Sequence, residues 1–177
     1  MDDFPIETHP FAPVLPPHAR VMMMGTFPPA AAKRCMAFHY PNFQNDMWRI
    51  YGLVFFNDAG HFQVAGEKRF DAGKIRDFLM AHNIALCPTV RRAVRERGNA
   101  SDKFLRIVEP VDLGAVLAQL PDCRWLFTTG GKATETLLSL LEPAPPMPPV
   151  NQAVAFDYHG RHLQLCRLPS SSRAYPL

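Results

Sequence analysis

The stretch that decides the fold is Val21-Met22-Met23-Met24-Gly25-Thr26-Phe27-Pro28-Pro29, a short apolar run followed by a stiff loop. Four consecutive apolar residues that end at a glycine and two prolines are typical of a short buried strand. Glycine lets the backbone approach a ligand closely, and proline fixes the loop. In open α/β sheets, ligands bind where loops leave the carboxyl ends of the strands. This loop is therefore a candidate ligand contact.

A second loop of the same kind lies near the other end of the chain. Leu168-Pro169-Ser170-Ser171-Ser172-Arg173 follows an alternating run from Arg161 to Arg167. Serine hydroxyls and a guanidinium are groups that bond phosphate oxygens, although a serine-rich turn is often only a turn. We expect this loop and the loop around Thr26 to meet at one crevice. If they lay at opposite ends of the sheet, the functional interpretation would be wrong.

Strand-like and helix-like segments alternate between these two loops. Apolar spacing predicts helices over residues 45–56, 72–82, 111–120 and 132–141, and strands over 21–24, 84–87, 124–128, 153–158 and 162–167. Strands that alternate with helices of this length pair in parallel and carry helices on both faces. The sequence therefore predicts a single α/β domain over residues 1–177. We expect a three-layer α/β/α sandwich with a central, mainly parallel sheet of four to five strands, preceded by an extended arm over residues 1–19.

Composition and net charge exclude few functional classes of protein. The net charge of +3, from 19 basic and 16 acidic residues, neither requires nor excludes nucleic acid as a partner. One cluster of arginines could contact DNA or could form a solvated helix face; it comprises Arg91, Arg92, Arg95 and Arg97. The cysteines include no close pair, which favours buried thiols over a metal site; they are Cys35, Cys87, Cys123 and Cys166. We expect no metal and no cofactor.

The N-terminus is acidic and is not followed by the apolar core of a signal peptide. The apolar runs elsewhere are too short to cross a bilayer. We therefore expect a cytoplasmic protein that is a monomer and does not bind membranes.

A polar and aromatic cluster over residues 39–48 is the most specific local signal. Amide side chains read the edges of bases and aromatic rings stack on them. In the alternative interpretation Phe43 and Trp48 belong to the core and Asn45 only caps a helix. His39 is a candidate general acid or phosphate contact. Polar loops also follow the other predicted core strands, over residues 97–102 and 128–133, and Asp102 in the first of them either joins the site or fixes its loop.

Five motifs in this order resemble the uracil-DNA glycosylase superfamily, nearest to its mismatch-specific and hypoxanthine-DNA glycosylase branch. They cover about residues 21–174. The motifs are Gly25-Thr26-Phe27-Pro28, the Tyr40-Pro41 to Asn45 to Trp48 pattern, residues 97–102, Thr129-Gly130 with Ala133, and Pro169-Ser170-Ser171-Ser172. The resemblance implies a parallel four-stranded sheet between helices. It also implies a monofunctional DNA-repair enzyme that flips a deaminated or mismatched base out of DNA and hydrolyses its N-glycosidic bond.

The resemblance also assigns roles to individual residues. The catalytic residues would be Asn45, which positions the water or binds the base, and Thr26. The base pocket would be formed by Gly25, Phe27, Pro28, Tyr40, Thr129 and Gly130. The contacts to DNA would come from Ser170, Ser171, Ser172, Arg173, Lys132 and His39.

The sequence departs from the family pattern at several points. Thr26 and Phe27 stand where the best-studied branches carry an Asp or Asn, Thr129 replaces an asparagine that reads the base, and the second motif lacks a histidine. The family also continues with a helix that we expect to be absent after Leu177. An alternative is therefore a catalytically weak or inactive nucleic-acid or nucleotide binder on the same fold. A hydrolase with a nucleophile among Ser170 to Ser172 is a third interpretation, but no GxSxG elbow surrounds them.

Overall fold

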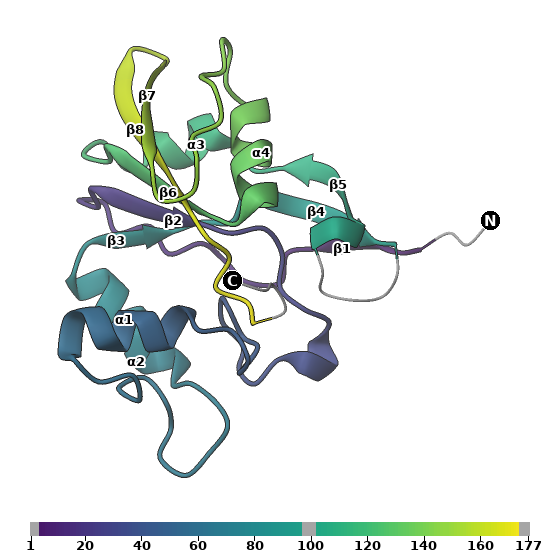
Figure 1. Ribbon diagram of the computed structural model, residues 1–177, viewed down its shortest axis with the longest axis vertical. Coiled ribbons are helices and arrows are strands. Elements are labelled where there is room, and N and C mark those ends of the chain that lie inside the picture. The colour runs from purple at the N-terminus through teal and green to yellow at the C-terminus, as the bar shows by residue number, and fades with distance from the viewer. Residues whose placement is uncertain (1–3, 97–101, 174–177) are drawn as a thin grey trace.

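Two sheets organise the residues that the computed structural model describes, which are 4–96 and 102–173 (Figure 1). The larger sheet has five strands in the order β3-β2-β6-β8-β7. Neighbouring strands are parallel except β7, which is antiparallel to β8. The predicted mixed α/β class with a mainly parallel sheet is confirmed. The bounds are β2 (Val21–Met24), β3 (Ile84–Leu86), β6 (Trp125–Thr129), β7 (Ala153–Tyr158) and β8 (Arg161–Leu168).

The second sheet was not expected from the sequence. It has three antiparallel strands in the order β1-β4-β5, with bounds β1 (Ile6–Thr8), β4 (Val90–Arg95) and β5 (Leu105–Pro110). The arginine cluster therefore lies on a strand, and the interpretation as a helix face is wrong. Arg91 and Arg92 are exposed, whereas Arg95 is buried and pairs with Glu7 of the N-terminal arm at 2.8 Å. Arg97 lies outside the described residues.

Four α-helices follow the predicted apolar spacing, with ends shifted by at most two residues. In α2 the predicted inward residues Ile75, Phe78 and Leu79 are buried. Asp112 caps α3 as expected, because its Oδ1 accepts the N–H of Ala115 at 3.1 Å. The bounds are α1 (Met47–Phe56), α2 (Ala72–Ala81), α3 (Leu113–Ala118) and α4 (Gly131–Ser139), with short 3₁₀ turns η1 (Ala31–Lys33) and η2 (Asp102–Phe104).

The alternation of side chains along β2 divides the core between the two faces of the larger sheet. Met22 and Met24 pack with residues of α3 and α4, whereas Met23 packs with residues of α1 and α2. Figure 1 shows these helix pairs on opposite sides of the sheet. A strand buried on both faces is continuously apolar, which is why a run of three methionines suits this position.

The hairpin between β7 and β8 turns at His159 and Gly160, as the sequence predicts. Both residues have positive φ, 47° and 78°, which is the backbone of the tight turn that joins twisted antiparallel strands. His159 and His162 are exposed beside it, as expected. The hairpin returns the chain through β8, so that the serine loop follows directly from the centre of the sheet.

The four cysteines are free thiols. Cys87 and Cys123 are buried, as expected, whereas Cys35 and Cys166 are only half-buried. Among the described residues, no helix combines the length and the apolar character needed to cross a bilayer.

The central strand should be the least tolerant of lost volume. Leu126 on β6 is fully buried, so Leu126→Ala should lower the free energy of unfolding by about 2–5 kcal/mol. Leu53 on α1 is 52% exposed, and Leu53→Ala should change stability by only about 0.5 kcal/mol. Urea unfolding of both variants measures the difference. Equal losses would contradict the assignment of β6 to the core.

Candidate active site

The loops that follow β2, β6 and β8 meet in a cavity of about 330 Å³. Parallel pairing brings them together: Met24 lies opposite Thr128, and Thr129 lies opposite Leu168. Thr26 and Ser171, far apart in sequence, line the same cavity. The expectation that the two loops converge is therefore confirmed.

Most of the predicted site residues line this cavity. They are Gly25, Thr26, Phe27, Pro28, His39, Tyr40, Asn45, Thr129, Ser170, Ser171 and Ser172. Gly130, Lys132 and Arg173 were predicted but do not line it. Sequence reasoning missed eight lining residues, namely His9, Phe11, Pro29, Lys33, Pro41, Asn42, Leu86 and Pro88. His9 and Phe11 belong to the proline-rich arm, whose lack of periodicity gave no signal of their position.

Hydrogen bonds to its carbonyl groups fix the loop after β2. The carbonyl of Gly25 accepts the N–H of Thr89 at 2.8 Å and its hydroxyl at 2.9 Å. The buried guanidinium of Arg95 donates to the carbonyl of Pro28 and lies 5.3 Å from the ring centre of Phe27. Because these carbonyl groups accept hydrogen bonds from within the protein, the loop is held in one conformation before a ligand binds.

Gly25, Tyr40 and Thr129 form the closest-packed part of the cavity wall. The hydroxyls of Tyr40 and Thr129 are hydrogen-bonded at 2.8 Å. A Cβ atom on Gly25 would lie 2.8 Å from the Tyr40 hydroxyl and 3.3 Å from Oγ1 of Thr129. The absence of a side chain at Gly25 is therefore what allows these two hydroxyls to meet at the end of β2.

Asn45 lines the cavity and lies one residue before Asp46, the N-cap of α1. Its Oδ1 accepts the N–H of Met47 at 3.0 Å, at the start of α1. Because a backbone N–H only donates, this contact fixes the orientation of the amide and leaves Nδ2 as a donor. The interpretation of Asn45 as the N-cap itself is wrong, and its Nδ2 group has no protein partner within the described part of the chain.

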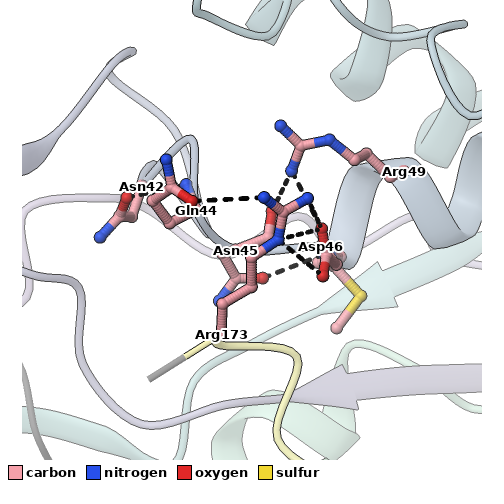
Figure 2. A network of polar contacts seen from close by, with 7 residues as sticks. Asn42, Gln44, Asn45, Asp46, Arg49 and Arg173 are labelled. Atoms are coloured by element: carbon pink, nitrogen blue, oxygen red, sulfur yellow. Dashed lines mark hydrogen bonds and ion pairs between the residues drawn. The ribbon is translucent and has the colours of Figure 1, made fainter. Parts of the chain in front are cut away.

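Arg173 ties the serine loop to the loop before α1 (Figure 2). Its Nη2 lies 2.8 Å from Oδ1 of Asp46, its Nε lies 3.1 Å from both carboxylate oxygens, and Nη1 contacts Gln44 at 3.3 Å. Arg49 holds the same carboxylate at 3.1 Å. The hydrogen bonds from Arg173 hold the pKa of Asp46 below its usual range. Arg173 is thus ion-paired within the protein, and its contact to DNA stays a prediction.

Backbone contacts reinforce this connection. The N–H of Asp46 donates to the carbonyl of Ser171 at 2.9 Å, and Asn45 pairs with Ser172 as an antiparallel bridge. Gly130, with φ of 94°, donates its N–H to the carbonyl of Leu168 and lies against Ser170.

Lys132 and His39, the two remaining predicted contacts to DNA, differ in their position. Lys132 lies in the first turn of α4, outside the cavity. His39 is 3% exposed, and its Nε2 donates to the carbonyl of Ala12 at 2.8 Å. Burial lowers the pKa of His39 to about 4. A direct phosphate contact by this neutral, enclosed ring is excluded, and His39 is instead part of the wall.

His9 is a second neutral histidine in the wall. Burial and the neighbouring His39, 5.4 Å away between ring centres, lower the pKa of His9 to about 3. Its Nδ1 accepts the N–H of Phe11 at 3.2 Å, so the proton of the neutral ring is on Nε2.

Trp48 belongs to the core, as the alternative interpretation expects. It is 1% exposed, and its Nε1 donates to the carbonyl of His39 at 2.9 Å. Phe43 is half-buried beneath the guanidinium of Arg49 at 4.4 Å. The predicted loop over 97–101 lies outside the described residues, and Asp102 begins η2.

The cavity is lined by aromatic rings, amides, hydroxyls and neutral imidazoles. No aspartate or glutamate occurs among the described residues that line it, and Lys33 contributes a positive charge. The described chain also holds no group of three or more His, Cys, Asp or Glu side chains suited to a metal ion. Such a cavity suits a planar, polar and neutral or anionic ligand.

No protein-family model matches the chain, and no curated protein matches it. The fold, however, has a solved counterpart. It is similar to the solution NMR structure of a protein from Methanosarcina acetivorans, provisionally described as a uracil DNA glycosylase. The TM-score is 0.65 at 22% identity, and the alignment covers 96% of this chain and 86% of the other. At this identity the likeness establishes the fold.

Filling the space at Gly25 should disrupt the cavity wall. Gly25→Ala should cost about 1–3 kcal/mol of stability, because the new methyl group would lie too close to the hydroxyl of Tyr40. Adding Tyr40→Phe should recover part of that loss by removing the nearest atom. Gly73→Ala in α2, where the nearest atom is 3.6 Å away, is the control and should not destabilise. Thermal unfolding of the three variants measures this, and a Gly25→Ala variant as stable as wild type would contradict the packing.

The two neutral histidines should make the fold sensitive to acid. Because their pKa values are lower in the folded chain, the unfolded chain binds more protons between about pH 6.5 and 4. Stability should therefore fall as the pH drops through this window, by at most about 1.4 kcal/mol per pH unit for each histidine. Urea unfolding from pH 7 to 4.5 measures the slope. His39→Gln should flatten it, whereas His162→Gln on the exposed hairpin should not.

Proposed function

We propose that this protein is a DNA-repair glycosylase on a three-layer α/β/α scaffold. Its substrate would be a deaminated or mismatched base, such as uracil or hypoxanthine, flipped out of DNA. The observation that carries the proposal is the convergence of the β2, β6 and β8 loops on one cavity with aromatic, amide and hydroxyl groups. The solved structure with a similar fold supports the same class of reaction.

Extrusion of the base would bring the N-glycosidic bond to the cavity. A base stacked in duplex DNA is unreachable, and extruding it costs a few kcal/mol, least for a mismatched or damaged base. Part of the selectivity for damaged or mismatched bases would thus arise during extrusion, before the base enters the cavity. Tyr40 and Phe27 would then pack against the base, while Ser170 to Ser172 would hold the phosphates beside it.

Cleavage would build an oxocarbenium-like sugar and leave negative charge on the base. Hydrogen-bond donors that are already in place stabilise such a developing charge most effectively. The Nδ2 group of Asn45 is such a donor, because Oδ1 is held by Met47. We therefore assign Asn45 to the departing base rather than to proton abstraction from water. Backbone N–H groups near Thr26 and Phe27 would assist, and the Thr26 hydroxyl would position the water.

The test is release of the base from labelled duplexes that carry uracil, hypoxanthine or a mismatch, read as strand cleavage after alkali. Wild type should release at least one of these bases, and Asn45→Ala should slow release by about 10²-fold or more at saturating protein. Gln152→Ala, an exposed amide outside the cavity, is the matched control and should match wild type. No release from any of these substrates would contradict the proposal.

A second candidate function is binding without turnover. The absence of a carboxylate among the described cavity residues favours it, since no strong base is present there to activate water. In that case the protein would bind abasic or mismatched DNA tightly and in a salt-sensitive way, yet would release no base even in molar excess over DNA.

A further inference from the structure

Three cations lie near the mouth of the cavity without a carboxylate partner. Lys33, Arg34 and Arg91 form none of the ion pairs found in the described parts of the chain, 4–96 and 102–173. We call these three residues the basic rim. Two other exposed arginines of the same small sheet do have carboxylate partners: Arg92 pairs with Glu109, and Arg106 with Glu96.

The rim residues come from two separate segments that meet at His9. Lys33, in η1, lines the cavity itself. Arg34 donates its Nε to the carbonyl of Pro29 at 2.8 Å and lies 5.4 Å from the ring centre of Phe11. Arg91, on β4, accepts the N–H of His9 at its carbonyl, at 2.7 Å.

The charges of Arg34 and Arg91 both act on His9. Burial and His39 lower the pKa of His9 most, and the two guanidinium groups lower it further. Both cations therefore lie close to an imidazole that lines the cavity, although the sequence separates them by 57 positions.

A second cavity continues this positive surface. It lies between the N-terminal arm and residues 30–34, has a volume of about 490 Å³, and is lined by both Arg34 and Arg95. Glu7 is the one carboxylate among the described residues that line either cavity, and it is bound to Arg95. Three cations, Lys33, Arg34 and Arg95, thus line the two cavities together with one carboxylate.

The residues that the sequence assigns to the DNA backbone bring no unpaired positive charge to the cavity wall. Arg173 is ion-paired with Asp46, His39 is buried, and Lys132 does not line the cavity. The serine loop offers hydroxyl groups but no free guanidinium among its described residues. If DNA is the partner, its negative charge has to be met elsewhere.

We propose that the basic rim of Lys33, Arg34 and Arg91 binds the phosphodiester backbone of DNA beside the extruded nucleotide. The inference rests on the proposed function, because it takes DNA as the partner. It joins Arg91, from the arginine cluster of the sequence, to Lys33 and Arg34 after the β2 loop in one binding surface. Each phosphate neutralised by a cation releases condensed counterions, so the logarithm of affinity falls with the logarithm of salt by about 0.9 per contact.

The experiment measures this salt dependence on DNA that cannot be cleaved. A labelled duplex with a stable abasic-site analogue is titrated by fluorescence anisotropy from 50 to 300 mM NaCl. Lys33→Ala/Arg91→Ala removes two exposed rim charges and leaves Arg34, which supports Pro29, in place. The slope should become shallower by about two, with affinity at low salt reduced at least tenfold.

Arg20→Ala/Lys68→Ala is the matched control, because it removes the same charge from exposed residues that line neither cavity. It should keep the wild-type slope. Equal slopes for the two double variants, or an unchanged slope for the rim variant, would overturn the proposal. Base release is assayed separately. If binding depends on the basic rim but no base is released, the proposed catalysis is refuted and the DNA-binding role of the rim is kept. If a base is released but the salt slope of the rim variant is unaltered, the role of the rim is refuted and the proposed catalysis is kept.

Discussion

The parallel register of β2, β6 and β8 is the constraint on which the site depends. Met24 lies beside Thr128, and Thr129 lies beside Leu168, so three loops leave the sheet at one edge. Residues 26 and 171 thereby become neighbours around one cavity. Both faces of the sheet are packed, with Met22 and Met23 pointing to opposite cores, and a slip of register by one residue would move each set of side chains into the other core. The packing that stabilises the sheet is thus also what assembles the loops.

Local patterns in the sequence are sufficient to predict β2, β6 and β8, the strands that form this parallel register. The run Val21–Met24 is a strand with the predicted bounds, and the last residue of β6 lines the cavity together with residues of the loops after β2 and β8. The second sheet could not be predicted in the same way. In β4 the residues do not alternate cleanly, because Arg95 is buried against Glu7, 88 positions away in the sequence. A local sequence pattern does not show that a charged side chain is buried when the partner that neutralises it is so distant in the sequence.

The same limit applies to the roles of individual side chains. The sequence predicts that Arg173 and His39 contact DNA and that Asn45 positions the water or binds the base. The role of each side chain depends on its partners, however: Arg173 has Asp46, His39 has the carbonyl of Ala12, and Asn45 has the N–H of Met47. Hydrogen bonds of this kind join segments far apart in sequence or depend on one helix start, and composition does not reveal them.

The distribution of charge around the cavity is consistent with departure of an anionic base. The described wall holds neutral histidines and no carboxylate, so negative charge that develops on a base inside would meet donors and no repelling anion. Lys33, Arg34 and Arg91 carry positive charge beside the cavity, where the phosphates of DNA would lie. A carboxylate inside would assist the water but oppose the leaving base. Under the proposed function, a wall without one would shift the catalytic demand from base catalysis toward stabilisation of the leaving group, and the fixed amide of Asn45 would supply it.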